Sequence, residues 1–323
     1  MPPSEPEQSR LEHFPVAFFA MTMGLSGLTL VWQKAAEVLG TSIFIAHGLL
    51  ILTGVVFIGL AAAYIGKALR HQDALRAEFN HPVKLSFFPT ISISLVLLGT
   101  ALRHIAPELG HMLWGLGAIA HLLLTLVIIN RWIHHPQFEI NHINPAWFIP
   151  AVGNILVPIA GSHYGYIAAS WFFFSIGVVF WVVLLTIVFY RIIFHDPLPQ
   201  RLLPTLFILV APPAAGFIAY MALNGELDTF GRIQINIALF FTLLLLIQFK
   251  RFAALPFFLS FWAYSFPLAA MTIAMMVYHQ LAAAAWTAPL SLLLLTLTTL
   301  VISWLLVLTL RAAKAGEICR PEG

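Results

Sequence analysis

Residues 261–274 read FWAYSFPLAAMTIA, an apolar stretch with a proline in its middle. Such side chains suit the interior of a bilayer. A proline inside an α-helix, however, removes a backbone N–H donor and clashes with the preceding turn, which costs about 3 kcal/mol. This proline, Pro267, directly follows the bulky Phe266. The stretch therefore predicts a membrane-spanning helix that is broken beside an aromatic ring.

The rest of the chain is also strongly apolar. Of its 323 residues, 60% are hydrophobic and 9% are charged, whereas soluble globular proteins carry about 25% charged residues. Apolar runs long enough to cross a hydrocarbon core about 30 Å thick recur along its whole length. We therefore expect an all-α integral membrane protein. Its net charge of +3 is expected to set topology in short loops, with no nucleic acid as a partner.

A search for apolar segments of about 20 residues predicts ten transmembrane helices. The expected ranges are 14–33, 41–68, 84–104, 109–133, 145–161, 165–194, 202–222, 229–249, 255–280 and 286–311. The range 145–161 is short and contains two prolines and two glycines, so a re-entrant segment is an alternative to a full span there. The predicted organisation is an N-terminal tail (1–13), one transmembrane channel domain (14–311) and a C-terminal tail (312–323).

Loop charges predict the orientation of these spans. One side receives both tails and the loops after the even-numbered spans, with thirteen Lys and Arg residues; the other side receives Lys34, Arg103 and Arg232. Because positive charge accumulates on the cytoplasmic side, we expect cytoplasmic N- and C-termini in a multi-pass protein of the inner, or plasma, membrane.

Prolines divide the spans into two kinds. Every odd-numbered span contains at least one, whereas among the even-numbered spans only the tenth does, with Pro289 near its start. Broken helices at membrane depth are tolerated where they are buried in protein or line a water-filled cavity. We therefore expect five helical hairpins, with the kinked odd-numbered helices forming an inner ring around a pore and the straight even-numbered helices outside.

The predicted spans lack carboxylates, which argues against ion-coupled transport. Proton- or sodium-coupled carriers usually place ionisable side chains inside the membrane, and the interior candidates here are His47 and His121. For both, a buried neutral ring bonded to a neighbouring helix is the favoured interpretation. No second histidine-rich segment accompanies HHPQFEINH (134–142), and Walker A, GxSxG and HExxH motifs are absent. We therefore expect no enzyme, no cofactor and no metal.

A ring without carboxylates, lined by Ser, Thr and backbone donors, suits anions better than cations. Cations at the cytoplasmic mouth would raise the local anion concentration, although a purely topological role for them is an equal alternative. These mouth residues are Lys84, Arg201, Lys250 and Arg251.

One motif on each odd-numbered span resembles the tellurite-resistance and dicarboxylate transporter family, which includes bacterial TehA-like proteins and plant slow-type anion channels. These motifs are FPVAFFAMTMGLSGLTLVW (14–32), LSFFPTISISLVLLG (85–99), PAWFIPAVGNILVPIAG (145–161), LPTLFILVAPPAAGFIAY (203–220) and FWAYSFPLAAMTIA (261–274). The resemblance implies ten helices around a central pore in each protomer of a homotrimer. It also implies that Phe266 plugs this pore, beside Pro267. Further pore-lining residues implied by the motifs are Phe19, Ser26, Phe88, Ser92, Asn154, Phe207 and Gly216.

These observations predict a passive channel for small anions such as chloride or nitrate, occluded by Phe266 at a hinge formed by Pro267. The alternative is a proton-linked exporter of C4-dicarboxylates such as malate, or of sulfite, which would need a titrating His47, His121 or His279. A membrane receptor or scaffold without transport is a third hypothesis.

Overall fold

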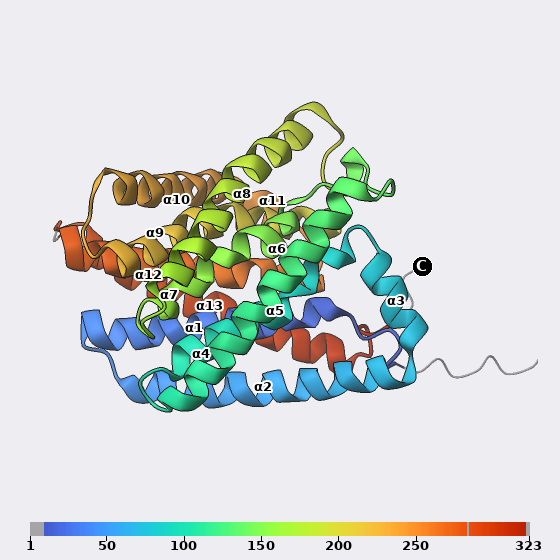
Figure 1. Ribbon diagram of the computed structural model, residues 1–323, viewed down its shortest axis with the longest axis horizontal. Coiled ribbons are helices and arrows are strands. Elements are labelled where there is room, and N and C mark those ends of the chain that lie inside the picture. Colours follow the sequence, from blue (N-terminus) through green and yellow to red (C-terminus); the bar gives the residue numbers. More distant parts are fainter. Residues whose placement is uncertain (1–9, 283, 321–323) are drawn as a thin grey trace, which may run out of the picture.

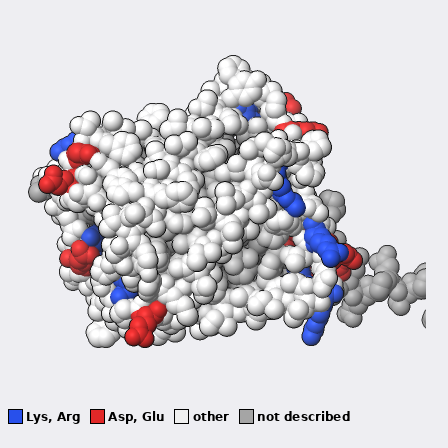
Figure 2. Space-filling model, in the orientation of Figure 1, with Lys and Arg blue, Asp and Glu red and all other residues white. Residues whose placement is uncertain are grey.

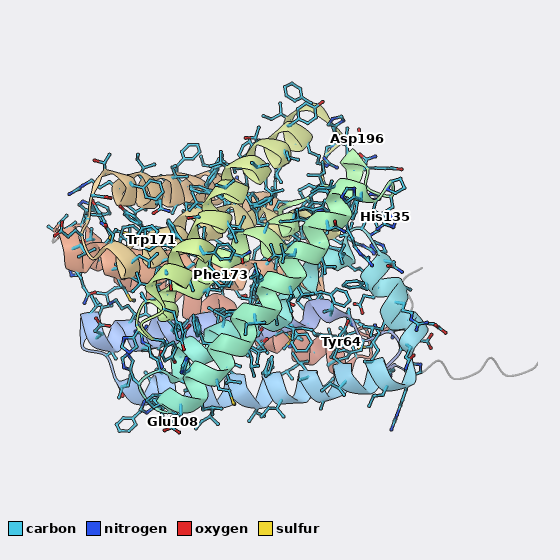
Figure 3. All side chains as sticks on the ribbon, viewed as in Figure 1. Tyr64, Glu108, His135, Trp171, Phe173 and Asp196 are labelled. Atoms are coloured by element: carbon cyan, nitrogen blue, oxygen red, sulfur yellow. The ribbon has the colours of Figure 1, made fainter. Side chains whose placement is uncertain are left out.

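In the computed structural model, which describes residues 10–282 and 284–320, every regular element is a helix (Figure 1). Nine helical spans in this part of the chain are long and apolar enough to cross a membrane. The main helices are α1 (Phe19–Leu39), α2 (Ile43–Arg70), α4 (Pro89–Leu102), α5 (Pro107–His134), α8 (Ile167–Phe194), α9 (Ala211–Asn224), α10 (Thr229–Ile247), α12 (Ser265–Ala282) and α13 (Thr287–Lys314). In Figure 3, Glu108 and His135 mark the two ends of α5.

Shorter elements complete or connect these spans. The short α-helices are α3 (Gln72–Asn80), α6 (Phe148–Val152), α7 (Val157–Gly161) and α11 (Phe249–Ala253). The 3₁₀ helices are η1 (Val16–Phe18), η2 (Lys84–Phe87), η3 (Ile140–His142), η4 (Pro145–Trp147), η5 (Gly153–Leu156), η6 (Gln200–Val210) and η7 (Leu259–Tyr264). The stretch from Pro145 to Gly161 is apolar and helical but shorter than the nine spans.

The helices therefore follow the predicted ranges, with differences at their ends. Glu37, expected outside the first span, lies in the last turn of α1. That helix continues to Leu39 because Gly40, with φ of 68°, ends it in the left-handed conformation that glycine adopts without strain. The last helix reaches Lys314, into the predicted C-terminal tail. Parts of both predicted tails lie outside the described residues.

A change from 3₁₀ to α geometry marks the five proline-containing segments. η1 leads into α1, η2 into α4, η4 into α6, η6 into α9 and η7 into α12. By contrast, α2, α5, α8 and α13 contain no such change, and proline occurs in these four only within the first turn of α5 and of α13. 3₁₀ turns are frequent at the ends of α-helices. Here they distinguish the five proline-containing segments from these four helices.

Burial separates the same two classes. In the spans that contain α1, α4, α9 and α12, between 67% and 78% of the most apolar 18 residues are buried. In those of α5, α8, α10 and α13 the share is 33%, and in α2 it is 11%. The four helices that follow a 3₁₀ stretch, α1, α4, α9 and α12, therefore form the core of the molecule, and the other five present apolar side chains outward.

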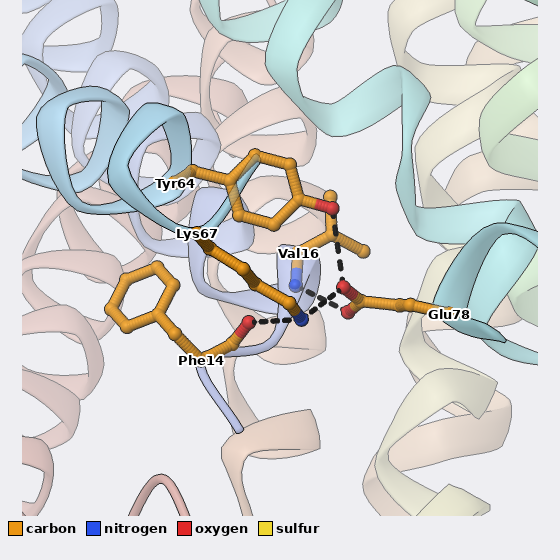
Figure 4. Close-up of polar contacts among 5 residues, drawn as sticks. All are labelled: Phe14, Val16, Tyr64, Lys67 and Glu78. Carbon is orange, nitrogen blue, oxygen red and sulfur yellow. Dashed lines mark hydrogen bonds and ion pairs between the residues drawn. The ribbon is translucent and has the colours of Figure 1, made fainter. Parts of the chain in front are cut away.

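A buried ion pair attaches the start of the first span to α2 and α3 (Figure 4). The Lys67 ammonium lies 2.7 Å from the Glu78 carboxylate and donates a second hydrogen bond, of 2.9 Å, to the Phe14 carbonyl. The same carboxylate accepts hydrogen bonds from the Val16 backbone N–H and the Tyr64 hydroxyl. Each charge is thus fully partnered, which is what makes its burial tolerable. Sequence analysis missed this pair because it placed Lys67 at the end of the second predicted span and Glu78 in the loop after it.

Candidate functional site

A small cavity lies where the five proline-containing segments meet. Its volume is about 50 Å³, and each of the five segments contributes to its wall. The lining residues are Met23 of the first segment; Ile93 of the second; Phe148, Ile149, Val152, Gly153, Ile155 and Leu156 of the third; Ile208, Ala211, Pro212 and Ala215 of the fourth; and Phe266 of the fifth. None of these side chains is ionisable, so the wall is apolar.

The size of the cavity limits what it can hold. One water needs at least about 10–15 Å³ measured in this way, so 50 Å³ corresponds to a few waters at most. A hydrated anion is larger than that. A hydrated anion could therefore enter the cavity only if side chains of its wall, Phe266 among them, moved apart.

Phe266 reaches this wall because α1 and α12 pack closely. A Cβ atom added at Gly24 would lie 2.2 Å from the Ser265 hydroxyl oxygen, and one added at Gly27 would lie 2.8 Å from the Ala269 Cβ and 3.5 Å from the Phe266 ring. Residues three apart lie on the same face of a helix, so these two glycines form the surface that receives α12. The partly buried Phe266 ring is thereby held beside α1.

Pro267 occupies a different position from the one predicted. It is the third residue of α12, after Ser265 and Phe266. The 3₁₀ helix η7 ends at Tyr264, directly before α12 begins. Proline is tolerated in the first turn of a helix because the N–H groups there have no intrahelical acceptor. The expected mid-helix break is therefore a junction between two helices, which removes most of the predicted cost.

Two polar residues predicted to line the pore are bonded to α5 instead of lining the cavity. The Ser92 hydroxyl lies 3.0 Å from Nδ1 of His121, and the Asn154 amide donates a 3.0 Å hydrogen bond to the Thr125 hydroxyl. His121 is fully buried, as predicted. These contacts attach α4 and η5 to α5.

The other predicted lining residues also lie outside the cavity wall. Phe19 packs edge-to-face on Tyr64 of α2, Phe88 on Phe79 of α3, and Phe207 on Tyr264 of η7. A Cβ added at Gly216 would lie 2.7 Å from the Gln234 side chain of α10. Of the residues predicted to gate or line the pore, Phe266 alone lines this cavity. Contact of the others with the ion path elsewhere stays a prediction.

Ser26 is the remaining predicted residue, and its hydroxyl has no hydrogen-bond partner among the described residues although it is fully buried. It lies three residues after Met23, which lines the cavity, and so on the same face of α1. An unpaired buried hydroxyl costs about 1–3 kcal/mol.

Charged residues occur at both ends of the helices. Of the predicted mouth cations, Lys84 begins η2, Arg201 lies in η6, and Lys250 and Arg251 lie in α11; the last three are exposed. Where α4 ends, the Arg103 guanidinium donates a 2.8 Å hydrogen bond to His104. Burial lowers the pKa of His104, and the neighbouring Arg103 charge lowers it further. This imidazole is therefore neutral at neutral pH.

No group of three His, Cys, Asp or Glu side chains in residues 10–282 and 284–320 could hold a metal ion. In the HHPQFEINH segment, His134 and His135 are exposed and His142 accepts a hydrogen bond from the Glu139 backbone N–H. This segment therefore comprises the exposed end of α5 and the connection after it, which includes η3.

Comparison with known proteins gives one consistent result. Residues 13–310 match a family described as voltage-dependent anion channel. The chain is 28% identical over 316 residues to an S-type anion channel of Arabidopsis thaliana, which covers 95% of this chain and 50% of that protein. It is 26% identical over 259 residues to a tellurite resistance protein TehA homologue of Haemophilus influenzae, which covers 80% of this chain and 79% of that protein.

An uncharacterised transporter of Methanocaldococcus jannaschii is 29% identical over 288 residues, covering 81% of this chain and 83% of that protein. Against two of the plant channels, the chain spans about half of their length, 50% and 53%.

Proposed function

The chain belongs to the voltage-dependent anion channel family, and on that premise we propose that it conducts small anions passively along a path through the central cavity, with Phe266 as the gate. The observation that carries this proposal is the composition of the cavity wall. All five proline-containing segments contribute to it, and it contains no ionisable side chain. A narrow apolar constriction blocks ions sterically and by dewetting.

Contacts between the proline-containing segments support their arrangement as a ring around this path. α1 contacts both α4 and α12, α12 contacts α9, α9 contacts η5 and α7, and these two contact α4. The series therefore returns to its starting helix. The more exposed helices α2, α5, α8, α10 and α13 would form five hairpins with these segments and face lipid or other protomers. We propose a homotrimer with one path in each protomer.

In the proposed topology the protein lies in the inner, or plasma, membrane, and both of its termini are in the cytoplasm. Support comes from the distribution of Lys and Arg between the two sides, since positive charge accumulates on the cytoplasmic side. Residues 14–311 would form a single channel domain between two tails. Lys84, Arg201, Lys250 and Arg251 would then surround the cytoplasmic mouth.

The positions of the histidines support passive conduction over the proton-linked export of malate or sulfite. Gly153 lies between His121 and the cavity. This glycine lines the cavity and is close to the His121 ring. His279 bonds to Thr287 of α13, and His47 packs beside Phe44 of α2. None of the three lines the cavity. Coupling to protons would need a titrating group on the path.

The reversal potential of the anion current distinguishes the two mechanisms. We expect that it follows the Nernst potential of the permeant anion and does not move when a pH gradient is imposed across the liposome or oocyte membrane. A shift of the reversal potential with the pH gradient at constant anion concentrations would show a coupled carrier. Absence of any anion flux from purified protein in liposomes would favour a receptor or scaffold.

The apolar wall predicts an order of permeability. An anion that passes residues such as Ile93 and Phe148 receives no compensation there for lost hydration, and burying an unpaired charge is strongly unfavourable. Nitrate is larger and more weakly hydrated than chloride, so we expect nitrate to be the more permeant. Bi-ionic reversal potentials measure this ratio, and a preference for chloride would indicate polar binding groups in the constriction.

A further inference from the structure

A second pocket opens on the surface between α3 and the end of α5. Its volume is about 370 Å³, and its wall combines two guanidinium groups with an apolar floor. The lining residues are Leu75, Arg76, Phe79, Asn80, Phe88 and Arg131. The pocket lies outside the central cavity, with which it shares no residue.

Arg131 is positioned firmly in this pocket, yet its charge is not neutralised. One guanidinium nitrogen, Nη1, donates to the Phe79 carbonyl at 3.1 Å and to the Asn80 side chain at 3.0 Å. The guanidinium also lies 4.3 Å from the centre of the Phe79 ring. Within the described part of the chain, Arg131 forms no ion pair with a carboxylate. A planar group with free donors and an unpaired charge suits a phosphate.

The acidic residues of α3 leave this charge uncompensated. Asp73 lies 3.6 Å from Arg76, with side chains that are fully exposed and 72% exposed respectively, so their interaction is weak. Glu78, the other carboxylate of α3, is buried in its ion pair with Lys67. The pocket therefore has a net positive charge. Figure 2 shows Lys and Arg gathered at the end of the molecule where α3 lies.

An apolar surface continues from the pocket along α5. Arg131 lies in the last turn of this span, and Val127 and Leu123 stand four and eight residues before it, on the same face of the helix. Their side chains are 43% and 59% exposed. The guanidinium thus stands at the edge of the apolar layer, directly above side chains that would face lipid.

We propose that this pocket binds the headgroup of an anionic phospholipid. Its phosphate would accept hydrogen bonds from Arg131 and Arg76, and an acyl chain would follow Val127 and Leu123. Basic pockets beside transmembrane helices at the membrane surface are suited to such headgroups. The apolar floor and the exposed face of α5 favour a lipid over a free phosphate, which would use neither.

The test measures lipid retention, which is independent of conduction. Full-length protein is stripped of lipid in detergent and incubated with phosphatidylglycerol or phosphatidylcholine, and native mass spectrometry counts the bound molecules. We expect at least one phosphatidylglycerol retained in preference to phosphatidylcholine. Arg76→Gln should weaken apparent affinity about fivefold, from roughly 1 kcal/mol for one cation near the surface. Arg131→Gln should weaken it about tenfold or more, since bonds to charged groups contribute about 1.5–3 kcal/mol.

Controls keep this result specific. Arg251→Gln removes an exposed cation of α11 that lies outside the pocket, and it should leave retention unchanged. Arg76→Gln alone removes only the weak exposed contact with Asp73, so its melting temperature should match that of the wild type. Equal retention of the two lipids, an equal loss in Arg251→Gln, or displacement of the lipid by millimolar inorganic phosphate would each overturn the proposal.

Discussion

Replacing Phe266 by alanine is expected to raise the anion conductance of this protein severalfold. The ring forms part of the wall of a cavity with room for only a few waters, and removing it widens the proposed path at that point. Because dewetting depends steeply on width, Phe266→Leu should give a smaller increase than Phe266→Ala. The effect is measured as chloride or nitrate current in oocytes, or as anion flux into liposomes. Each value is divided by the amount of protein in the membrane.

Phe207→Ala is the matched control for this gate. Phe207 comes from the same set of sequence motifs, but its ring packs against Tyr264 and Phe252, with centroids 4.5 and 5.0 Å away, and does not line the cavity. Because Phe207 lies outside the cavity wall, its truncation should raise the conductance much less than Phe266→Ala does. The gate assignment fails if Phe266→Ala reaches the surface normally and carries no more current than the wild type.

The second large effect concerns stability. Glu78→Leu is expected to destabilise the protein by about 3–5 kcal/mol, because it leaves the Lys67 ammonium buried without its counter-charge. The side chains of this pair are only 4% and 6% exposed. The substitution also removes the acceptor of the Val16 backbone N–H, which directs the chain into η1. Unfolding in mixed micelles measures the change.

A double substitution tests the electrostatic origin of this loss. Lys67→Met in the Glu78→Leu background removes the unpaired charge and should recover part of the stability, but not all of it, since the Val16 N–H and the Tyr64 hydroxyl still lack their acceptor. Asp73→Asn, which removes an exposed carboxylate 3.6 Å from Arg76, should change stability by less than about 1 kcal/mol. No recovery in the double variant would mean that packing, rather than charge, dominates.

Hydropathy alone determined the class of protein and the approximate positions of its long apolar helices. The predicted ranges agree with nine spans and with the shorter Pro145–Gly161 segment. This succeeds because lipid requires every backbone polar group to be satisfied within a helix, so that an apolar run of sufficient length has few alternatives. Proline also identified the more buried helices, because helical irregularity at membrane depth is tolerated only away from lipid.

Only the tertiary structure decided which side of each buried helix faces the cavity. α4 is buried along most of its length, and its four Ser and Thr residues are buried together with its apolar ones, so its sequence contains no amphipathic pattern that indicates a rotation. The family motif implied that Ser92 lines the pore, which stays a prediction; in the structure Ser92 bonds to His121, and Ile93 lines the cavity. Adjacent residues differ by about 100° around a helix, so an uncertainty of one position exchanges one face for another.

The polar contacts between distant segments were likewise beyond the sequence. Lys67 was predicted at the end of the second span and Glu78 in the loop after it, yet the turn after α2 folds α3 back so that both lie under Phe14 and Val16. Phe266 could be singled out because its motif resembles that of a known family, whereas its place in the first turn of α12 came only from the structure. Its place in the cavity wall depended on Gly24 and Gly27 of α1, which are far from it in the chain. Close packing between two helices is decided by side chains from both partners, so one segment alone could not show it.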